Sequence, residues 1–203
     1  MGFVKNTGHT PAANLEAEDT LAHSLAALND SDADTRRHAV HHLAHYPEAI
    51  PPLCQRLENE PDIAVRTSIL TALIKIGVPQ AAGCLIPYLR SENVALRNDV
   101  IVALQEMQHI SLPLVEQLLT DSDTDIRIFA INILARIRDP QVPALLLRVI
   151  EIDPHINVWS TALDAIAETG TQDMVPTIQA SLDRFDNEYG RFAVQFAIQR
   201  ISE

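Results

Sequence analysis

Apolar residues recur along this chain at helical spacing, and the pattern repeats about every thirty residues. Five arginines, Arg36, Arg66, Arg97, Arg127 and Arg191, lie 30, 31, 30 and 64 residues apart, and Trp159 divides the double gap. Three residues after each of these six positions stands an apolar side chain, and another stands seven residues after. Such offsets fall on one stripe of an α-helix. The sequence therefore predicts six copies of an amphipathic helix, here called helix B.

A second column of residues lies upstream of each copy and predicts another helix, here called helix A. Its members are Pro51, Gly83, Pro113, Pro143 and Pro176, and each stands six residues before Leu57, Leu89, Leu119, Val149 or Leu182. Proline is tolerated in the first turn of a helix, because its missing N–H has no intrahelical partner to lose. Pro87 falls late in the third helix A and predicts a kink or an early end there.

The turns between helix A and helix B are acidic or polar. Four residues before the Arg/Trp column stand residues suited to capping a helix N-terminus, namely Asp32, Asp62, Asn93, Asp123, His155 and Asn187. A pair of such short helices cannot bury both apolar faces alone, whereas stacked pairs share one continuous core. The expected fold is all-α, an α-α superhelix of about six antiparallel helix pairs in one solenoid over residues 16–203, preceded by a flexible N-terminal arm at 1–15. The expected repeats cover about 19–46, 48–77, 79–108, 110–139, 140–170 and 172–203.

The stretches DSDADTRRHAVHHLA, PDIAVRTSILTALIKIG and DSDTDIRIFAINILARI resemble HEAT repeats, specifically the short bacterial repeats of the phycobilisome-lyase-like HEAT families. The resemblance covers about residues 19 to 203. It implies that helices B line an inner, concave surface. It also implies a structural ladder between neighbouring repeats, formed by Asp32, Arg36, Asp62, Arg66, Asn93, Arg97, Asp123 and Arg127.

Composition narrows the function classes. The chain has 15 Lys and Arg against 27 Asp and Glu, a formal net charge of -12. This acidic balance and the lack of a basic patch argue against binding to nucleic acid or to an anionic membrane. Cys54 and Cys84 are too few for a disulfide framework and are expected to be small buried hydrophobes. Without a secretion signal or a membrane span, the expected location is the cytoplasm.

Helix B positions that point away from the core define the expected working surface. Aromatic residues are concentrated near the C-terminus, and Phe129 shares the same inner columns. One interpretation is that the terminal repeat uses large side chains to close its core. The other is a partner-binding concave face, formed by Phe129, Arg136, Asp164, Phe192, Phe196 and Arg200, for a helix or an extended peptide of another protein. The last helix also allows a homodimer through the C-terminal repeat.

The run RRHAVHHLAHY places four histidines on the first helix B. The candidate metal ligands are His38, His41, His42 and His45, because histidines four residues apart on a helix can hold one transition metal. HEAT-repeat hydroxylases that depend on iron use His-Glu pairs in several repeats, and this chain has no His-Glu dipeptide. We expect no resident cofactor, and we regard the His cluster as a solvated or pH-sensitive patch rather than a metal site.

Catalytic motifs are missing from the sequence: it has no glycine-rich phosphate loop, no G-x-S-x-G and no HExxH. We therefore expect a non-catalytic scaffold or adaptor that binds another protein on its concave face. Two alternatives stay open at this point. One is an auxiliary subunit or chaperone of a cofactor or pigment lyase, and the other is a metal-binding protein built on the His cluster.

Overall fold

The structure, a computed structural model, describes residues 20–203, and it consists of helices and turns with no strand in that range. The arm expected at 1–15 lies outside the described residues. Contacts divide the chain into two compact units, one ending at Ile76 and the other running from Gly77 to Glu203. The all-helical α-α solenoid predicted from the repeat pattern is confirmed, and each of the six expected repeats contains its two helices.

The first unit contains the first two repeats. Its first helix A covers residues 20–27. The remaining elements are α2 (Ala33–Leu43), the 3₁₀ turn η1 (Pro47–Ala49), α3 (Ile50–Asn59) and α4 (Ile63–Ile76). The two helices B, α2 and α4, pack against each other, and α3 packs against α4.

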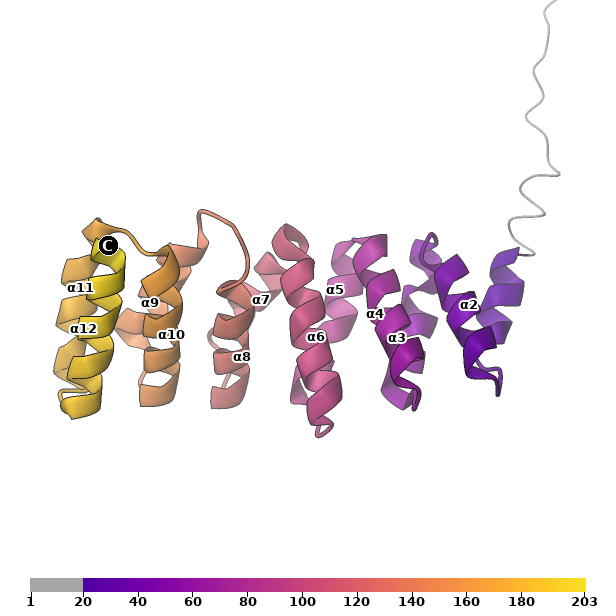
Figure 1. Cartoon of the computed structure of the whole chain (residues 1–203), viewed down its shortest axis with the longest axis horizontal. Helices are drawn as coiled ribbons and strands as arrows, with labels where there is room; N and C mark the ends of the chain where they lie inside the picture. The colour runs from indigo at the N-terminus through magenta and orange to yellow at the C-terminus, as the bar shows by residue number, and fades with distance from the viewer. Residues whose placement is uncertain (1–19) are drawn as a thin grey trace, which may run out of the picture. The chain divides into compact units, whose positions relative to one another are not determined.

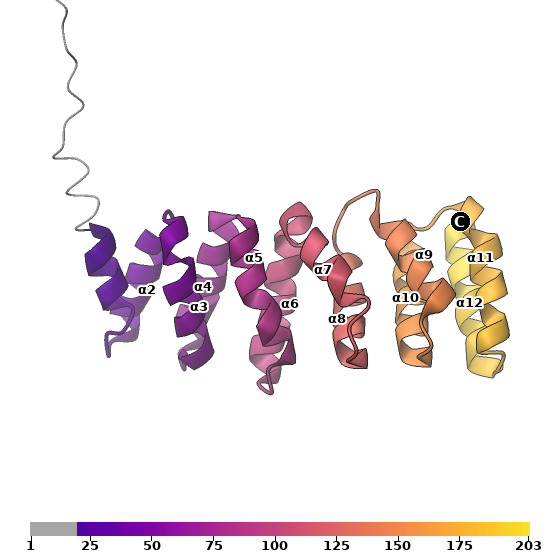
Figure 2. The ribbon, with the colours of Figure 1, turned by 180° about the vertical axis from the view of Figure 1, so that it is seen from behind.

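The second unit contains the other four repeats. Its helices A are α5 (Pro79–Leu85), α7 (Leu112–Leu118), α9 (Val142–Ile152) and α11 (Val175–Ala180). Its helices B are α6 (Val94–Glu106), α8 (Thr124–Leu134), α10 (Ile156–Thr169) and α12 (Glu188–Ser202). Within this unit the helices B stand side by side in one layer (Figure 1), and the helices A form the other layer, seen from behind in Figure 2. We call the outward side of α6, α8, α10 and α12 the helix-B face.

The proline column starts the helices A as predicted. Pro51, Pro113, Pro143 and Pro176 are each the second residue of their helix. A backbone N–H at that position has no acceptor within the helix, so the N–H that proline lacks costs no hydrogen bond. The early end expected from Pro87 is also confirmed. α5 stops at Leu85, and the chain continues as the 3₁₀ helix η2 (Ile86–Arg90), because a proline in the interior removes a hydrogen bond and clashes with the preceding turn.

The core lies between the two layers of each unit. The helix B positions three residues after the Arg/Trp column are all buried: Ala39, Ile69, Val100, Ala130, Ala162 and Val194. Those seven residues after it are also buried from Leu43 to Ile166, and only Ile198 in the last helix is half-buried. The apolar stripe read from the sequence is therefore the stripe that packs.

Two further expectations bear on the protein's surroundings. No helix within residues 20–203 is long and apolar enough to cross a lipid bilayer. Cys54 is buried and Cys84 is half-buried. The described part of the chain contains no free cysteine, so the expectation that both cysteines are only small buried hydrophobes is corrected.

Candidate functional site

The polar column before each helix B caps that helix. Asp32 accepts a hydrogen bond from the backbone N–H of Thr35 at 2.8 Å, and Asp62 accepts from Ala64 and Val65. The same role falls to Asn93, Asp123, His155 and Asn187. Each cap satisfies a backbone N–H that the first turn leaves without a partner. Hydrogen bonding to Thr35 holds the pKa of Asp32 below its ordinary value.

The arginine column forms the ties between repeats. Arg36 donates from Nε and Nη2 to the two carboxylate oxygens of Glu60, at 2.9 and 2.7 Å, and from Nη1 to the backbone carbonyls of its own turn. Arg127 repeats this arrangement on Asp153, at 2.7 and 3.3 Å. The acids that pair with Arg36 and Arg127 are therefore Glu60 and Asp153, each two residues before a cap residue. Among the cap residues, Asp123 also pairs with Arg90 of the preceding repeat at 3.3 Å.

Glu60 is the most strongly perturbed acid of the ladder. Its side chain is fully buried, and Arg56 donates to it at 2.7 Å in addition to Arg36. Burial alone would raise its pKa. The hydrogen bonds from Arg36, Arg56 and the N–H of Asp62 outweigh burial and lower the pKa of Glu60 from 4.5 to about 2.

The ladder position at Arg97 differs from this pattern. Arg66 is buried. Arg97 donates Nη1 to the carbonyl of Ser91 and lies over the Phe129 ring, 5.3 Å from its centroid, but its Nε is buried without a hydrogen-bond acceptor. Asp121, at the position equivalent to Glu60, pairs instead with Arg90 at 2.5 Å.

At the junction of the last two repeats an aromatic pair replaces the ion pair. Trp159 occupies the arginine column and is fully buried, and Phe185 occupies the acid column of the next repeat. Their ring centroids lie 5.0 Å apart. The indole Nε1 donates to Ser181 Oγ at 3.1 Å, so no polar atom of the indole is left unsatisfied.

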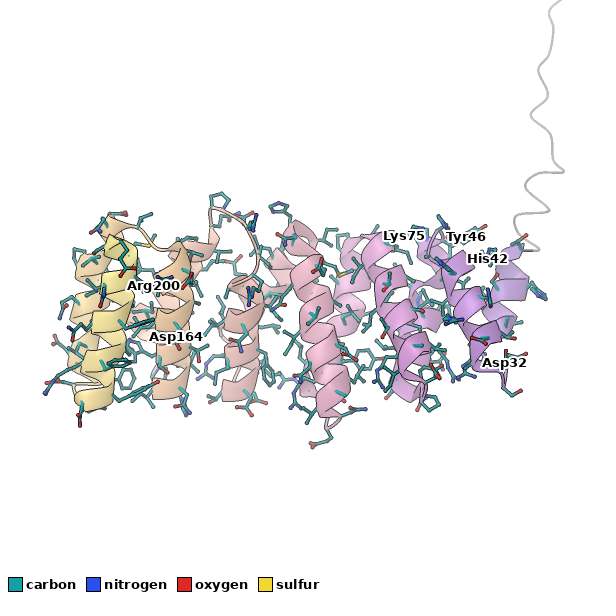
Figure 3. The ribbon with its side chains drawn as sticks, viewed as in Figure 1. Asp32, His42, Tyr46, Lys75, Asp164 and Arg200 are labelled. Carbon is teal, nitrogen blue, oxygen red and sulfur yellow. The ribbon has the colours of Figure 1, made fainter. Side chains whose placement is uncertain are left out.

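The histidines of α2 are spread along an exposed surface of the first unit. The backbone carbonyl of Asp34 lies 2.8 Å from His38 Nδ1, and Lys75 Nζ lies 3.2 Å from His45 Nε2. Figure 3 labels His42 and Lys75 on this unit. Across residues 20–203 no three His, Cys, Asp or Glu side chains gather in an arrangement that could hold a metal ion.

Five of the six residues predicted to bind a partner lie on α8, α10 and α12, and Arg136 lies in the turn just after α8. The exposed residues among the six are Arg136, Asp164, Phe192, Phe196 and Arg200. Phe129 is half-buried beneath Arg97. The Phe192 and Phe196 rings stack with centroids 6.3 Å apart and are 67% and 43% exposed. Tyr189, one turn earlier on the same helix, is also exposed. Tyr189 is not among the six residues predicted from the sequence, although its spacing of three residues from Phe192 places both on one side of the helix.

Charges on this face are paired unevenly. Arg200 donates to Glu168 at 3.0 Å and to Glu203 at 3.2 Å, which raises the pKa of Arg200. Asp164, one turn before Glu168, makes no hydrogen bond or ion pair with any residue from 20 to 203. Partial burial raises the pKa of Asp164. Figure 3 shows Asp164 and Arg200 on the neighbouring helices α10 and α12.

The predicted residues do not converge on one cavity. Phe129 borders a groove of about 250 Å³ and Arg136 borders another of about 410 Å³. A groove of about 460 Å³ opens beside α7 and α9, in the layer of helices A, and none of the six predicted residues lines it. The candidate surface on the helix-B face is thus broad and open, which suits a macromolecular partner better than a small substrate.

Together, the helix pairs, the caps and the arginine ties define a repeat protein of the α-solenoid class. The family model for HEAT repeats matches residues 21–108 and 111–199. The two matches cover well over half of the chain, and the protein therefore belongs to the HEAT-repeat family.

Solved structures of the same general fold resemble this chain at low sequence identity. The CpcE and CpcF complex of phycocyanin lyase from a Nostoc species is 17% identical, with 99% of this chain and 98% of that chain covered and a TM-score of 0.40. An archaeal HEAT-like repeats protein from Thermococcus onnurineus is 18% identical over 94% and 91% of the two chains, with a TM-score of 0.48. Human deoxyhypusine hydroxylase is 14% identical over 97% and 92%, with a TM-score of 0.45. No curated protein sequence matches the chain.

Proposed function

We propose that this protein is a non-catalytic scaffold or adaptor that binds another protein through the helix-B face of its last three repeats. The observation that carries the proposal is the stripe of three exposed aromatic side chains on α12, Tyr189, Phe192 and Phe196. Aromatic residues that stay exposed next to charged groups are typical of protein interfaces, where they supply most of the binding free energy.

The alternative role for these aromatics, closing the core of the terminal repeat, fits their burial poorly. The residues of α12 that close the core are Gly190, Ala193, Val194 and Ala197, all buried and all small or β-branched. The large side chain that fills the core of this region is Trp159 on α10, with Phe185 against it. Phe192 and Phe196 project away from that core, so their contribution to folding is small and a binding role explains their exposure.

The proposal is tested with the double substitution Phe192→Ser and Phe196→Ser. The matched control is Ile152→Ser, which removes a similarly exposed apolar side chain from α9 in the layer of helices A. Proteins retained from the native host by the wild-type chain are identified and purified. Their affinity for the wild type and for both variants is measured by isothermal titration calorimetry. Far-ultraviolet circular dichroism verifies that each variant keeps its helical fold.

We expect a purified partner to lose at least about tenfold in affinity with the double variant, because hot-spot aromatics each contribute about 2 kcal/mol. The control is expected to bind as the wild type does. A partner whose affinity is the same for the double variant and for Ile152→Ser binds elsewhere, and that result would overturn the assignment of this face.

A further inference from the structure

Among the described residues, the Asp164 carboxylate has no counter-ion, whereas the neighbouring acidic residue on the same helix is paired. Glu168, one turn away, is held by Arg200 at 3.0 Å. Asp164 has no hydrogen bond or ion pair with any described residue, and neighbouring groups partly shield it from water, which raises its pKa. A carboxylate in this situation is stabilised by any cation that reaches it.

The same place in the fold offers aromatic ring faces. Asp164 and Phe196 occupy equivalent positions of adjacent repeats, 32 residues apart, on the packed helices α10 and α12. Phe196 stacks with Phe192, their planes inclined by 20°. A cation placed over an aromatic ring gains electrostatic attraction from the π-system, so the carboxylate and the two rings form complementary parts of one site.

Within this chain, arginine already makes this kind of contact. Arg97 lies over Phe129 and Arg184 lies over Phe185, each with the guanidinium carbon 5.3 Å from the ring centroid. The planar guanidinium pairs with both oxygens of a carboxylate and stacks on a ring, which the ammonium of lysine cannot do equally well. The net charge of -12 also favours the approach of a basic segment.

From these observations we infer that the helix-B face at α10 and α12 binds an arginine side chain of a partner protein, with the guanidinium on Asp164 and against the Phe192–Phe196 pair. The inference rests on the proposed partner-binding function and specifies the chemistry of the partner: an exposed segment that presents an arginine. A second copy of this chain is the competing occupant of the aromatic stripe.

The test uses three synthetic peptides of equal length, acetyl-(Arg-Gly)4-amide and its counterparts with lysine and with citrulline in place of arginine. Citrulline has nearly the shape of arginine without its charge. Binding to the full-length protein is followed at about 150 mM salt by ¹H–¹⁵N NMR titration. The variants are Asp164→Asn and, as a matched control, Asp183→Asn, which removes the same charge at an exposed position of the 3₁₀ helix η5 (Ser181–Arg184).

We expect the arginine peptide to shift amide signals of α10 and α12, with weaker binding of the lysine peptide and none of the citrulline peptide. Asp164→Asn is expected to weaken binding of the arginine peptide about tenfold, from the loss of the charge-assisted hydrogen bonds between the carboxylate and the guanidinium, and Asp183→Asn less than twofold. Equal losses in the two variants, or signal shifts confined to other helices, would overturn the inference, because binding would then follow net charge alone.

Two further outcomes separate this inference from the proposed function. If Phe192→Ser with Phe196→Ser weakens binding of a purified partner but Asp164→Asn does not, the face binds a partner without using the carboxylate, and the arginine site is refuted alone. If light scattering shows a dimer of the wild-type chain that the double variant abolishes, a second copy covers the stripe, and the inference is again refuted.

Discussion

The buried carboxylate of Glu60 should make the stability of the first unit depend on pH, and comparison with a variant that lacks this carboxylate should reveal its contribution. The folded-state pKa is about 2 against 4.5 for the solvent-exposed carboxyl of the unfolded chain, because Arg36 and Arg56 hold the ionised form. At about 1.4 kcal/mol per pKa unit, the difference corresponds to about 3 kcal/mol of folding free energy. Since the folded pKa is lowered, this contribution is fully present above pH 4.5 and is lost as the pH falls towards 2.

The perturbation is Glu60→Gln, which keeps the size of the side chain and removes its charge. We expect the free energy of unfolding to fall by about 3 kcal/mol at pH 7, because Arg36 is left buried with only a neutral partner. The control, Glu58→Gln, alters an exposed residue of α3 without a partner among the described residues, and it should change stability by less than about 0.5 kcal/mol.

The assay is urea denaturation followed by circular dichroism at pH 7, 5, 4 and 3, with hydrogen exchange of the α2 and α4 amides to locate the effect. Other acids also titrate in this range, so the informative quantity is the difference between wild type and Glu60→Gln at each pH. That difference should shrink steadily below pH 4.5. A deficit of the same size at pH 7 and at pH 3 would refute the reasoning, because it would show that shape and not charge is lost.

Two pairs of substitutions test the packing of the second unit. Gly190→Ala should destabilise by about 1–3 kcal/mol, because the added Cβ would lie 2.2 Å from the Phe185 carbonyl oxygen, whereas Gly83→Ala, with open space around its Cβ, should stabilise α5 by about 0.5–1 kcal/mol in thermal melts. Trp159→Arg alone should cost more than about 3 kcal/mol by burying an unpaired charge, and adding Phe185→Asp should recover part of that loss, since the pair recreates the tie seen elsewhere; a double variant no more stable than the single one would contradict this equivalence.

Much of the fold follows from residues whose role is set by their immediate neighbours. An aspartate at an N-cap or a proline in the first turn acts through its own helix, so Asp123 and Pro143 could be placed correctly from sequence. The apolar stripe is equally local, since a spacing of three and seven residues fixes one side of a helix. These features depend on no knowledge of the neighbouring repeat.

The ion pairs between repeats were harder to predict from the sequence, because each depends on which acidic side chain a given arginine reaches. Glu60 and Asp153 stand two residues before their cap, and a column of acids at that offset was present in the sequence but was attributed to turns. Asp121 belongs to the same column, yet it pairs with Arg90 and leaves Arg97 Nε without an acceptor. The side-chain conformations of Arg90 and Arg97 decide which of the two pairs with Asp121, and the spacing of the repeats does not determine these conformations.

The Trp159–Phe185 contact stands where other repeats have an ion pair, and it lies beneath the helices of the proposed binding surface. Ties such as Arg127–Asp153 weaken when their acid is protonated, whereas an aromatic contact in the core carries no charge to titrate or to screen. The helix that bears the exposed aromatics, α12, packs on α10 beside this buried aromatic contact, and the exposed Arg200–Glu168 pair also joins the two helices. A partner that brings a cation to Asp164 therefore meets a support whose buried contact carries no charge, and salt acts on that support through the exposed Arg200–Glu168 pair. Binding at this face should accordingly show the salt dependence of its own ion pair and of the Arg200–Glu168 pair.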